Sequence, residues 1–354
     1  PAGHDDGRPL LVIRFEGVNK VFGDGTVAVA DLDLELPAGR ISVLVGPSGC
    51  GKTTSLRMVN RLVTPTSGRV LLDGRDVATQ DETTLRRHIG YVIQHAGLFP
   101  HRTVLDNIAT VPRLLGVSRV EARRRARELI ERVGLPAALA GRYPASLSGG
   151  QQQRVGVARA LAADPPVMLM DEPFSAVDPV VRGALQQEFL RLQRELGTTI
   201  ALVTHDIDEA VTLGDQVAVF REGGHLAQVG TPEDLLTAPA DVFVASFVGR
   251  DRGWRSLSFL PAGELTPRPL PAELRLDADG RPLSWATAAG EVAAASFGDE
   301  DSVRQAADLA ISSPTGYAVH VDDTGRATGV VSHADVAGFV AARRRGSARG
   351  TATP

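Results

Sequence analysis

Apolar runs of two kinds predict the sheets of this chain. Near its start, short runs at 11–13 and 27–29 flank Asp24-Gly25, a two-residue turn signal, and predict antiparallel strands between Leu10 and Leu36. Four later runs are continuously apolar except for Ser42, which is typical of the strands of a parallel sheet covered on both faces: 41–45, 167–170, 200–203 and 217–220. The pattern indicates an α/β fold with a parallel core sheet and an antiparallel β subdomain.

The stretch between the first two buried runs predicts helices. Its clearest segment, 118–133, has one apolar face: Ala126, Leu129, Ile130 and Val133. Arginines at 123–125 lie in the same segment, but glutamates interleave with them, which is typical of a solvated helix face. We therefore expect a helical subdomain and no nucleic-acid partner.

Length, charge and cysteine content narrow the class of protein. With 354 residues the chain is long enough for about two domains, and its net charge of -4 gives no reason to expect nucleic acid. No run reaches the roughly 18 apolar residues of a membrane span. Cys50 is the only cysteine, so no internal disulfide is expected, and no secretory signal is visible. A reducing cytoplasm is the expected compartment.

A second, smaller domain is predicted after Gly249, because prolines interrupt any long element there. Within it, 275–281 aligns with 320–326 at a separation of 45 residues, each a strand that runs into an Asp/Gly turn. We expect two similar hairpins that pack together. The predicted organisation is a disordered leader (1–9), a first domain (10–249), a second domain (250–342) and a disordered tail (343–354).

The first buried run ends in a phosphate-binding loop. Its residues are Gly46, Pro47, Ser48, Gly49, Cys50, Gly51, Lys52, Thr53 and Thr54. Glycines let the backbone wrap around phosphates, and the helix that follows points its first N–H groups at the anionic oxygens. Lys52 reaches the β- and γ-phosphates of ATP, and Thr53 supplies a hydroxyl to Mg²⁺. The loop predicts a nucleoside triphosphatase.

Two further segments add chemistry to this loop. After the second buried run, Asp171 is placed to hold Mg²⁺ and Glu172 to polarise the attacking water. The segment 147–154 opens a helix that Ser148 caps, and its two glycines permit a second phosphate to approach. Since one nucleotide does not need two helix N-termini from one chain, we expect a homodimer that encloses ATP between two copies.

Together these motifs resemble an ATP-binding cassette (ABC) ATPase. The resemblance rests on motifs in the order and spacing of that family: the phosphate loop, Gln94 after the strand 91–93, the Leu-Ser-Gly-Gly-Gln signature at 147–151, Asp171-Glu172, the segment 175–178 and Thr204-His205. It covers about 10–249. It implies a P-loop NTPase cassette that hydrolyses ATP with Mg²⁺.

The resemblance also implies roles for single residues. Gln94 contacts Mg²⁺ and the lytic water, His205 contacts the γ-phosphate, and both join Glu172 in the catalytic set. Phe22 stacks on adenine, with a core position beside the turn as the competing interpretation. Mg²⁺ is held by Thr53, Gln94 and Asp171. The residues at the dimer seam, which include contacts to ATP on the other copy, are Ser148, Gly149, Gly150, Gln151 and Asp178.

Within the family, 91–104 and 60–68 look most like the ATPases of importers for osmoprotectants such as glycine betaine, proline, carnitine and choline. The resemblance implies a peripheral motor on the cytoplasmic face of the membrane. Separate permease subunits dock near Gln94 and the helical region, and a substrate-binding protein delivers the cargo. Importers of another amino acid or of polyamines are the alternative. A soluble cassette ATPase acting on DNA or in translation is disfavoured, because such proteins typically show two cassettes, long coiled coils or a basic surface.

The second half of the C-terminal domain resembles a cystathionine-β-synthase (CBS) regulatory motif. It has a strand, an Asp/Gly turn and then the run 329–335. In that family the residues matching Ser332 and Asp335 hold the ribose and phosphate of an adenine nucleotide. The 45-residue alignment places Thr287 opposite Ser332 but Gly290 opposite Asp335, so the first half is a degenerate copy. Nucleotide sensing and a packing role without ligand are both open.

Overall fold

The computed structural model describes residues 12–94, 97–175, 177–249, 251–288 and 290–350. The chain forms two compact units that divide between Phe247 and Val248, two residues before the boundary expected after Gly249. The expected leader at 1–9 lies outside the described residues, as do His95, Ala96 and Ala176 from the family motifs.

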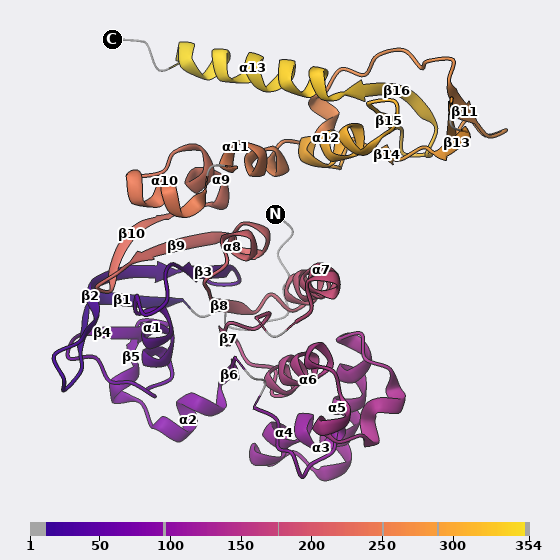
Figure 1. The fold of residues 1–354 in the computed structure, drawn as a ribbon. Coiled ribbons are helices and arrows are strands. Elements are labelled where there is room, and N and C mark those ends of the chain that lie inside the picture. Colours follow the sequence, from indigo (N-terminus) through magenta and orange to yellow (C-terminus); the bar gives the residue numbers. More distant parts are fainter. Residues whose placement is uncertain (1–11, 95–96, 176, 250, 289, 351–354) are drawn as a thin grey trace. The chain divides into compact units, whose positions relative to one another are not determined.

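The first unit contains sheets of both predicted kinds (Figure 1). An antiparallel sheet has the order β2-β1-β4-β5, and the predicted strands β1 (Ile13–Val21) and β2 (Val27–Leu36) pair across a turn at Gly25. β4 (Ser67–Leu72) and β5 (Arg75–Asp76) complete it. Its apolar side chains join those of the central sheet in one hydrophobic core.

The central sheet has the order β10-β9-β3-β8-β7-β6. The four predicted buried runs are its inner strands: β3 (Ile41–Val45), β7 (Val167–Asp171), β8 (Thr199–Thr204) and β9 (Gln216–Arg221). The four strands pair with one another in parallel. β6 (Ile89–Val92) adds a fifth parallel strand beside β7, whereas β10 (His225–Gly230) pairs antiparallel with β9. The predicted parallel sheet is confirmed, and the carboxyl ends of β3, β6, β7 and β8 meet at one edge.

Helices follow these strands and also form a subdomain of their own. The helices after β3, β7 and β8 are α1 (Lys52–Val59), α7 (Pro179–Leu196) and α8 (Ile207–Leu213). The predicted helical subdomain comprises α3 (Val104–Ile108), α4 (Thr110–Leu114), α5 (Arg119–Arg132) and α6 (Gly149–Leu161). Ala126, Ile130 and Val133 lie in its core, as the apolar face of 118–133 predicts. The remaining helices of the unit are α2 (Glu82–Arg87), α9 (Pro232–Thr237) and α10 (Val242–Val248).

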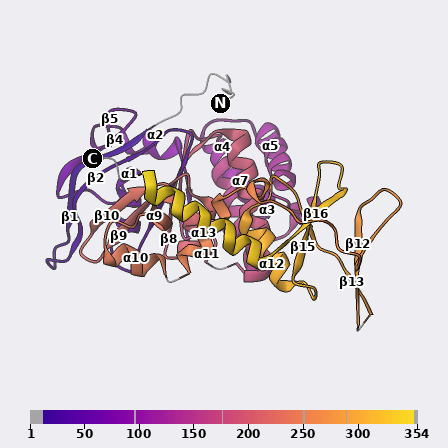
Figure 2. The same ribbon diagram turned by 90° about the horizontal axis from the view of Figure 1, so that it is seen from above.

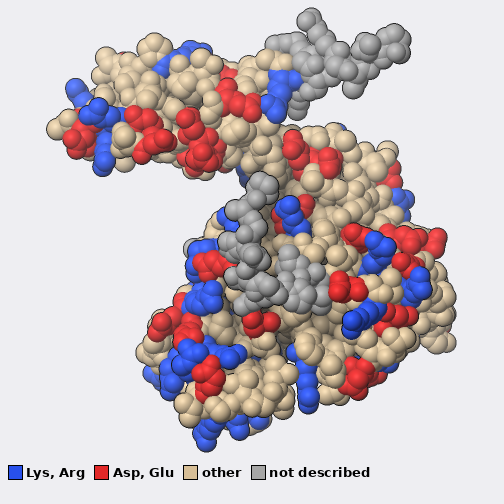
Figure 3. All heavy atoms as spheres, turned by 180° about the vertical axis from the view of Figure 1, so that it is seen from behind, with Lys and Arg blue, Asp and Glu red and all other residues tan. Residues whose placement is uncertain are grey.

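The charged face of α5 is solvated, as expected. Arg124 pairs with Glu121 and Glu128, and Arg125 also pairs with Glu121. On the face of the molecule in Figure 3, basic and acidic residues are likewise interspersed. No helix among the residues that the structure describes is long and apolar enough to cross a membrane.

The second unit is built around two hairpins. The first consists of β11 (Leu274–Leu276) and β12 (Pro282–Thr287), extended by β13 (Gly290–Ala293). The second consists of β15 (Tyr317–Val321) and β16 (Ala327–Ser332), and β14 (Ser296–Phe297) pairs parallel with β15. The helices of the unit are α11 (Arg252–Arg255), α12 (Val303–Ser312) and α13 (His333–Gly350).

The two hairpins repeat each other closely and lie side by side (Figure 2). In each turn one aspartate, Asp277 or Asp322, accepts hydrogen bonds from the backbone N–H groups two and four residues later. The turns also touch, since the N–H of Ala327 donates to the carbonyl of Gly280 at 2.9 Å. An apolar cluster joins the hairpins: Leu274, Trp285, Val319 and Val330. The predicted repeat and its packing are confirmed, whereas the CBS resemblance itself stays a prediction.

Helix α13 corrects the prediction of a disordered tail at 343–354. Its backbone is helical as far as Gly350, and only 351–354 lie outside the described residues. Alanine and arginine predominate between 341 and 349, both are strong helix formers, and no proline stops the helix. The polar composition that suggested disorder is therefore also compatible with a continued helix.

Candidate functional site

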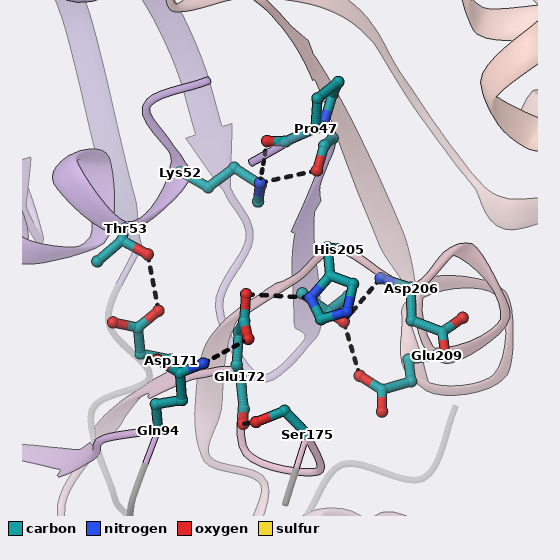
Figure 4. Close-up of polar contacts among 12 residues, drawn as sticks. Pro47, Lys52, Thr53, Gln94, Asp171, Glu172, Ser175, His205, Asp206 and Glu209 are labelled. Carbon is teal, nitrogen blue, oxygen red and sulfur yellow. Dashed lines mark hydrogen bonds and ion pairs between the residues drawn. The ribbon is translucent and has the colours of Figure 1, made fainter. Parts of the chain in front are cut away.

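The phosphate loop lies between β3 and α1 and surrounds the ammonium group of Lys52. This side chain is only 6% exposed, and its Nζ donates to the carbonyl oxygens of Gly46 at 2.8 Å and Pro47 at 2.7 Å (Figure 4). The positive charge is thus held by the loop's own backbone at the N-terminus of α1, where helix N–H groups also favour an anion. The loop has the chemistry to bind phosphate.

Close backbone approach explains two of the loop's glycines. Gly51 has a φ of +94°, and a Cβ there would lie 1.9 Å from the carbonyl oxygen of Ala28. A Cβ on Gly46 would lie 2.3 Å from the carbonyl oxygen of Phe220. The loop therefore packs directly against backbone of the neighbouring strands, which fixes its position.

Substitution Gly51→Ala is expected to destabilise the chain by more than the roughly 1–2 kcal/mol that a left-handed backbone alone costs an L-residue. The reason is that overlap with the Ala28 carbonyl adds to the strain. Urea denaturation measures the change. Gly25→Ala is the matched control, because Gly25 has a φ of +85° but open space around its Cβ position. An equal loss of unfolding free energy in the two variants would show that the close approach of the Ala28 carbonyl does not matter.

Thr53 and Asp171 bring hard oxygen donors together beside this loop. The Thr53 hydroxyl donates to Asp171 Oδ1 at 2.8 Å, and the Arg57 guanidinium lies 3.6 Å from Asp171 Oδ2. No group of three or more His, Cys, Asp or Glu that could hold a metal occurs among the described residues. Mg²⁺ takes one or two protein carboxylates and completes its shell with phosphate oxygens and water. The Thr53 hydroxyl and the Asp171 carboxylate fit Mg²⁺, and the role of Gln94 as a further ligand stays a prediction.

Gln94, Glu172 and His205 converge from three neighbouring strands. Gln94 follows β6, which ends at Val92, while Glu172 follows β7 and His205 follows β8. Gln94 Nε2 donates to Glu172 Oε2 at 2.8 Å, and His205 Nδ1 lies 3.1 Å from Glu172 Oε1 (Figure 4). The structure thus brings the three predicted catalytic residues together, with Gln94 and His205 both in contact with the carboxylate of Glu172.

The backbone of Glu172 is strained. Its φ of +48° lies in the left-handed region, which non-glycine residues rarely adopt. The N–H of Glu172 donates to the carbonyl of Val203 at 2.9 Å, and Ser175 Oγ donates to the Glu172 carbonyl at 3.0 Å. Strain of this kind costs about 1–3 kcal/mol and clusters at functional sites. These two bonds hold the backbone of Glu172 in this conformation.

The signature segment faces solvent. Ser148 caps α6, since its Oγ accepts from the N–H of Gln151 at 3.3 Å while Gln151 Oε1 accepts from the N–H of Ser148 at 3.0 Å. Ser148 and Gly149 are exposed, Gly150 is half-buried, and no described contact links the segment to the phosphate loop. The N-terminus of α6 is therefore exposed and capped, and its contact with a phosphate stays a prediction.

Phe22 and Asp178 occupy positions open to a nucleotide or a second copy. Phe22 is 41% exposed, so the competing interpretation as a core residue is wrong. The Lys20 ammonium lies 5.2 Å from the centre of the Phe22 ring. Asp178 precedes α7, and its carbonyl accepts the N–H of Arg182 at 3.0 Å. The stacking of Phe22 on adenine and the place of Asp178 at the dimer seam stay predictions.

Ser332 and Asp335 cap α13. Asp335 Oδ2 accepts from the N–H of Ser332 at 2.9 Å and from its hydroxyl at 2.6 Å, and the Nε of Arg268 donates to Oδ1 at 2.9 Å. Burial alone raises the pKa of Asp335, but the bonds from Ser332 and Arg268 outweigh it and lower that pKa. Binding of a nucleotide by these two residues stays a prediction.

Three charged residues beside the phosphate loop and the catalytic residues were not predicted from the sequence: Arg57, Arg182 and Glu209. Glu209 is 5% exposed and accepts a hydrogen bond from the Thr204 hydroxyl at 2.7 Å. Burial raises the pKa of Glu209, and the bond from Thr204 offsets part of this rise. A lone charged residue on a helix carries no sequence signal for such a position, because most are solvated.

Comparisons with known proteins agree with the geometry. A family model described as ABC transporter matches residues 29–175. The chain is 52% identical over 260 residues to the osmoprotectant import ATP-binding protein OsmV of Salmonella typhimurium, a match that covers 72% of this chain and 68% of OsmV. It is 50% identical over 241 residues to the glycine betaine/carnitine/choline transport ATP-binding protein OpuCA of Bacillus subtilis. That match covers 68% of this chain and 63% of OpuCA, less than two thirds of its length.

Among solved structures, the fold is similar to that of the ATP-binding cassette MJ0796, determined as a dimer bound to ADP and phosphate after hydrolysis. The TM-score is 0.57 and the sequence identity 32%, and the match covers 62% of this chain and 98% of MJ0796. The similarity therefore extends over nearly all of that chain.

Proposed function

The chain belongs to the ABC transporter family, and from this premise we propose that it is the ATP-hydrolysing subunit of an importer for osmoprotectants of the glycine betaine type. The observation that carries the proposal is the convergence of Lys52, Thr53, Asp171 and Glu172 at one edge of the central sheet. The names of the relatives OsmV and OpuCA support the class of cargo.

In the proposed reaction the chain's own groups bind ATP, order the water and accept its proton. The phosphate loop binds the β- and γ-phosphates, with Lys52 turned toward them, and Phe22 stacks on the base. Thr53 and Asp171 hold Mg²⁺, which neutralises phosphate charge when bound. Glu172 accepts the proton of the attacking water, and its bonds to Gln94 and His205 fix the orientation of its carboxylate.

Two copies enclose two nucleotides in this proposal. The exposed N-terminus of α6, with Ser148 and Gly150, contacts the γ-phosphate held by the other copy, and its exposure supports this contact. The dimeric MJ0796 structure supports this arrangement. ATP then stabilises the joined state, and hydrolysis releases it.

The partners outside the chain are permease subunits in the membrane and a substrate-binding protein. Four apolar side chains near Gln94 and in the helical subdomain support a docking surface there, because they are exposed: Ile93 at 37%, Phe99 at 39%, Leu114 at 63% and Leu115 at 40%. We therefore place the chain at the cytoplasmic face of the membrane, held there by the permease.

Uptake of labelled glycine betaine at high osmolarity tests the cargo. Cells that depend on this chain should take it up, and the same cells with Glu172→Gln should not, because hydrolysis drives transport. Glu222→Gln is the matched control, since Glu222 is exposed in the turn between β9 and β10. Uptake unchanged by Glu172→Gln would send the search for cargo to other amines and amino acids.

A further inference from the structure

One arginine side chain spans two loops of the site. Arg182 lies in the first turn of α7, and one of its terminal nitrogens donates to the carbonyl of Val177 at 3.2 Å. The other lies 3.7 Å from Asp206 Oδ2. Val177 directly precedes Asp178, and Asp206 directly follows His205. A single guanidinium therefore joins the backbone next to the proposed dimer seam to the loop that carries His205.

One nitrogen of Arg182 is in an unfavourable environment for hydrogen bonding. Its Nε is buried and has no hydrogen-bond partner among the described residues. A buried donor left without a partner costs about 1–3 kcal/mol. The fold thus holds the guanidinium between the two loops despite this cost, and such a group calls for an explanation.

Hydrogen bonds tie the two residues that flank His205 to Glu209 and to the start of α8. The Thr204 hydroxyl donates to buried Glu209 at 2.7 Å and accepts from the N–H of Asp206 at 3.0 Å (Figure 4). Asp206 also caps α8 by accepting from the N–H of Asp208 at 2.8 Å. The charged groups that face this loop are Glu172, Arg182, Asp206 and Glu209.

We propose that Arg182 is a positioning residue for ATP hydrolysis, one that sets the His205 loop according to the position of the segment before Asp178. The inference rests on the proposed two-copy function. When a second copy contacts Asp178, any shift of the Val177 carbonyl moves the guanidinium, and through Asp206 it moves His205 relative to Glu172. Hydrolysis at one site then depends on the presence of the other copy.

The test is steady-state hydrolysis by the purified full chain. Arg182→Ala should lower kcat by about 10- to 100-fold, the loss expected from a small misplacement of reacting groups, and leave the KM for ATP unchanged. Arg182→Lys should recover part of the rate, because an ammonium can pair with Asp206 but lacks the second arm for Val177. Arg191→Ala on the same helix, which removes exposed pairs to Glu188 and Glu195, should leave the rate unchanged.

Asp206→Asn completes the test as a double-mutant cycle. Asparagine keeps the cap on α8 but loses the charge that faces Arg182. If the two residues act through each other, the double variant is no slower than Arg182→Ala alone. A wild-type kcat for Arg182→Ala, or independent losses that multiply in the double variant, overturns the inference.

Dimer formation separates this inference from the proposed function. Glu172→Gln mixed with Mg²⁺ and ATP should sediment as a dimer. If it does and Arg182→Ala still hydrolyses ATP at the normal rate, only the role of Arg182 fails. If it stays a monomer, the two-copy function fails and the inference fails with it.

Discussion

Replacing Glu172 with glutamine is expected to slow steady-state ATP hydrolysis by about 10²- to 10⁴-fold, the usual contribution of a general base. Glutamine has the same shape, so Gln94 keeps a hydrogen-bond acceptor on it, but an amide does not accept a proton from water. ATP should therefore stay bound, and copies joined by ATP should stay joined. Phosphate release measures the first effect, and sedimentation with Mg²⁺ and ATP measures the second.

The control for Glu172→Gln is Glu222→Gln, which makes the same change of charge at an exposed turn. Its hydrolysis rate should match that of the unchanged protein. Normal turnover by Glu172→Gln would show that another group accepts the proton. The strained backbone at φ +48° would then need an explanation other than catalysis.

The phosphate loop could be predicted from sequence because each of its parts has a requirement that few residue types meet. At Gly51 the space for a Cβ is taken by the Ala28 carbonyl, so only glycine fits. The cap of α6 could also be predicted, since a serine followed three residues later by glutamine is a capping-box pattern. Ser148 and Gln151 make both bonds of this capping box.

The meeting of Gln94, Glu172 and His205 could not be derived from spacing alone. It depends on β6, β7 and β8 being direct neighbours in the sheet, although long helical segments separate them in sequence. This strand order had to come from the resemblance to a family. Arg182 was missed for the same reason, because only the fold brings α7 against the loop after β8.

In the C-terminal unit, one pattern predicts two different structures. A serine and an aspartate three residues apart at the start of a helix suit a nucleotide site, but they also form a capping box. Ser332 and Asp335 make the capping bonds, and Arg268 pairs with the same carboxylate. Sequence cannot separate the two, because both need a hydroxyl and a carboxylate at this spacing.

Replacing Ser148 with arginine is expected to lower hydrolysis by on the order of 10²–10³-fold, as the loss of a key phosphate contact does, while each single chain still binds ATP. The side chain is exposed at the N-terminus of α6, where arginine fills the space that a phosphate of the other copy's ATP would occupy. The phosphate loop of the same chain has no contact with Ser148 among the described residues and is left unchanged. Calorimetry with ATP and a phosphate-release assay measure the two quantities separately.

The matched control is Ser118→Arg in the same subdomain. Ser118 is also an exposed N-cap, with its Oγ accepting from the N–H of Glu121 at 3.2 Å, so both variants lose a cap worth about 1 kcal/mol. Only Ser148→Arg should lose hydrolysis, because in the proposed dimer α6 contacts the second nucleotide and α5 does not. Loss of ATP binding by single chains of Ser148→Arg would place the signature in its own chain's site and contradict the shared one. Equal hydrolysis by the two variants would mean that α6 does not contact ATP at all.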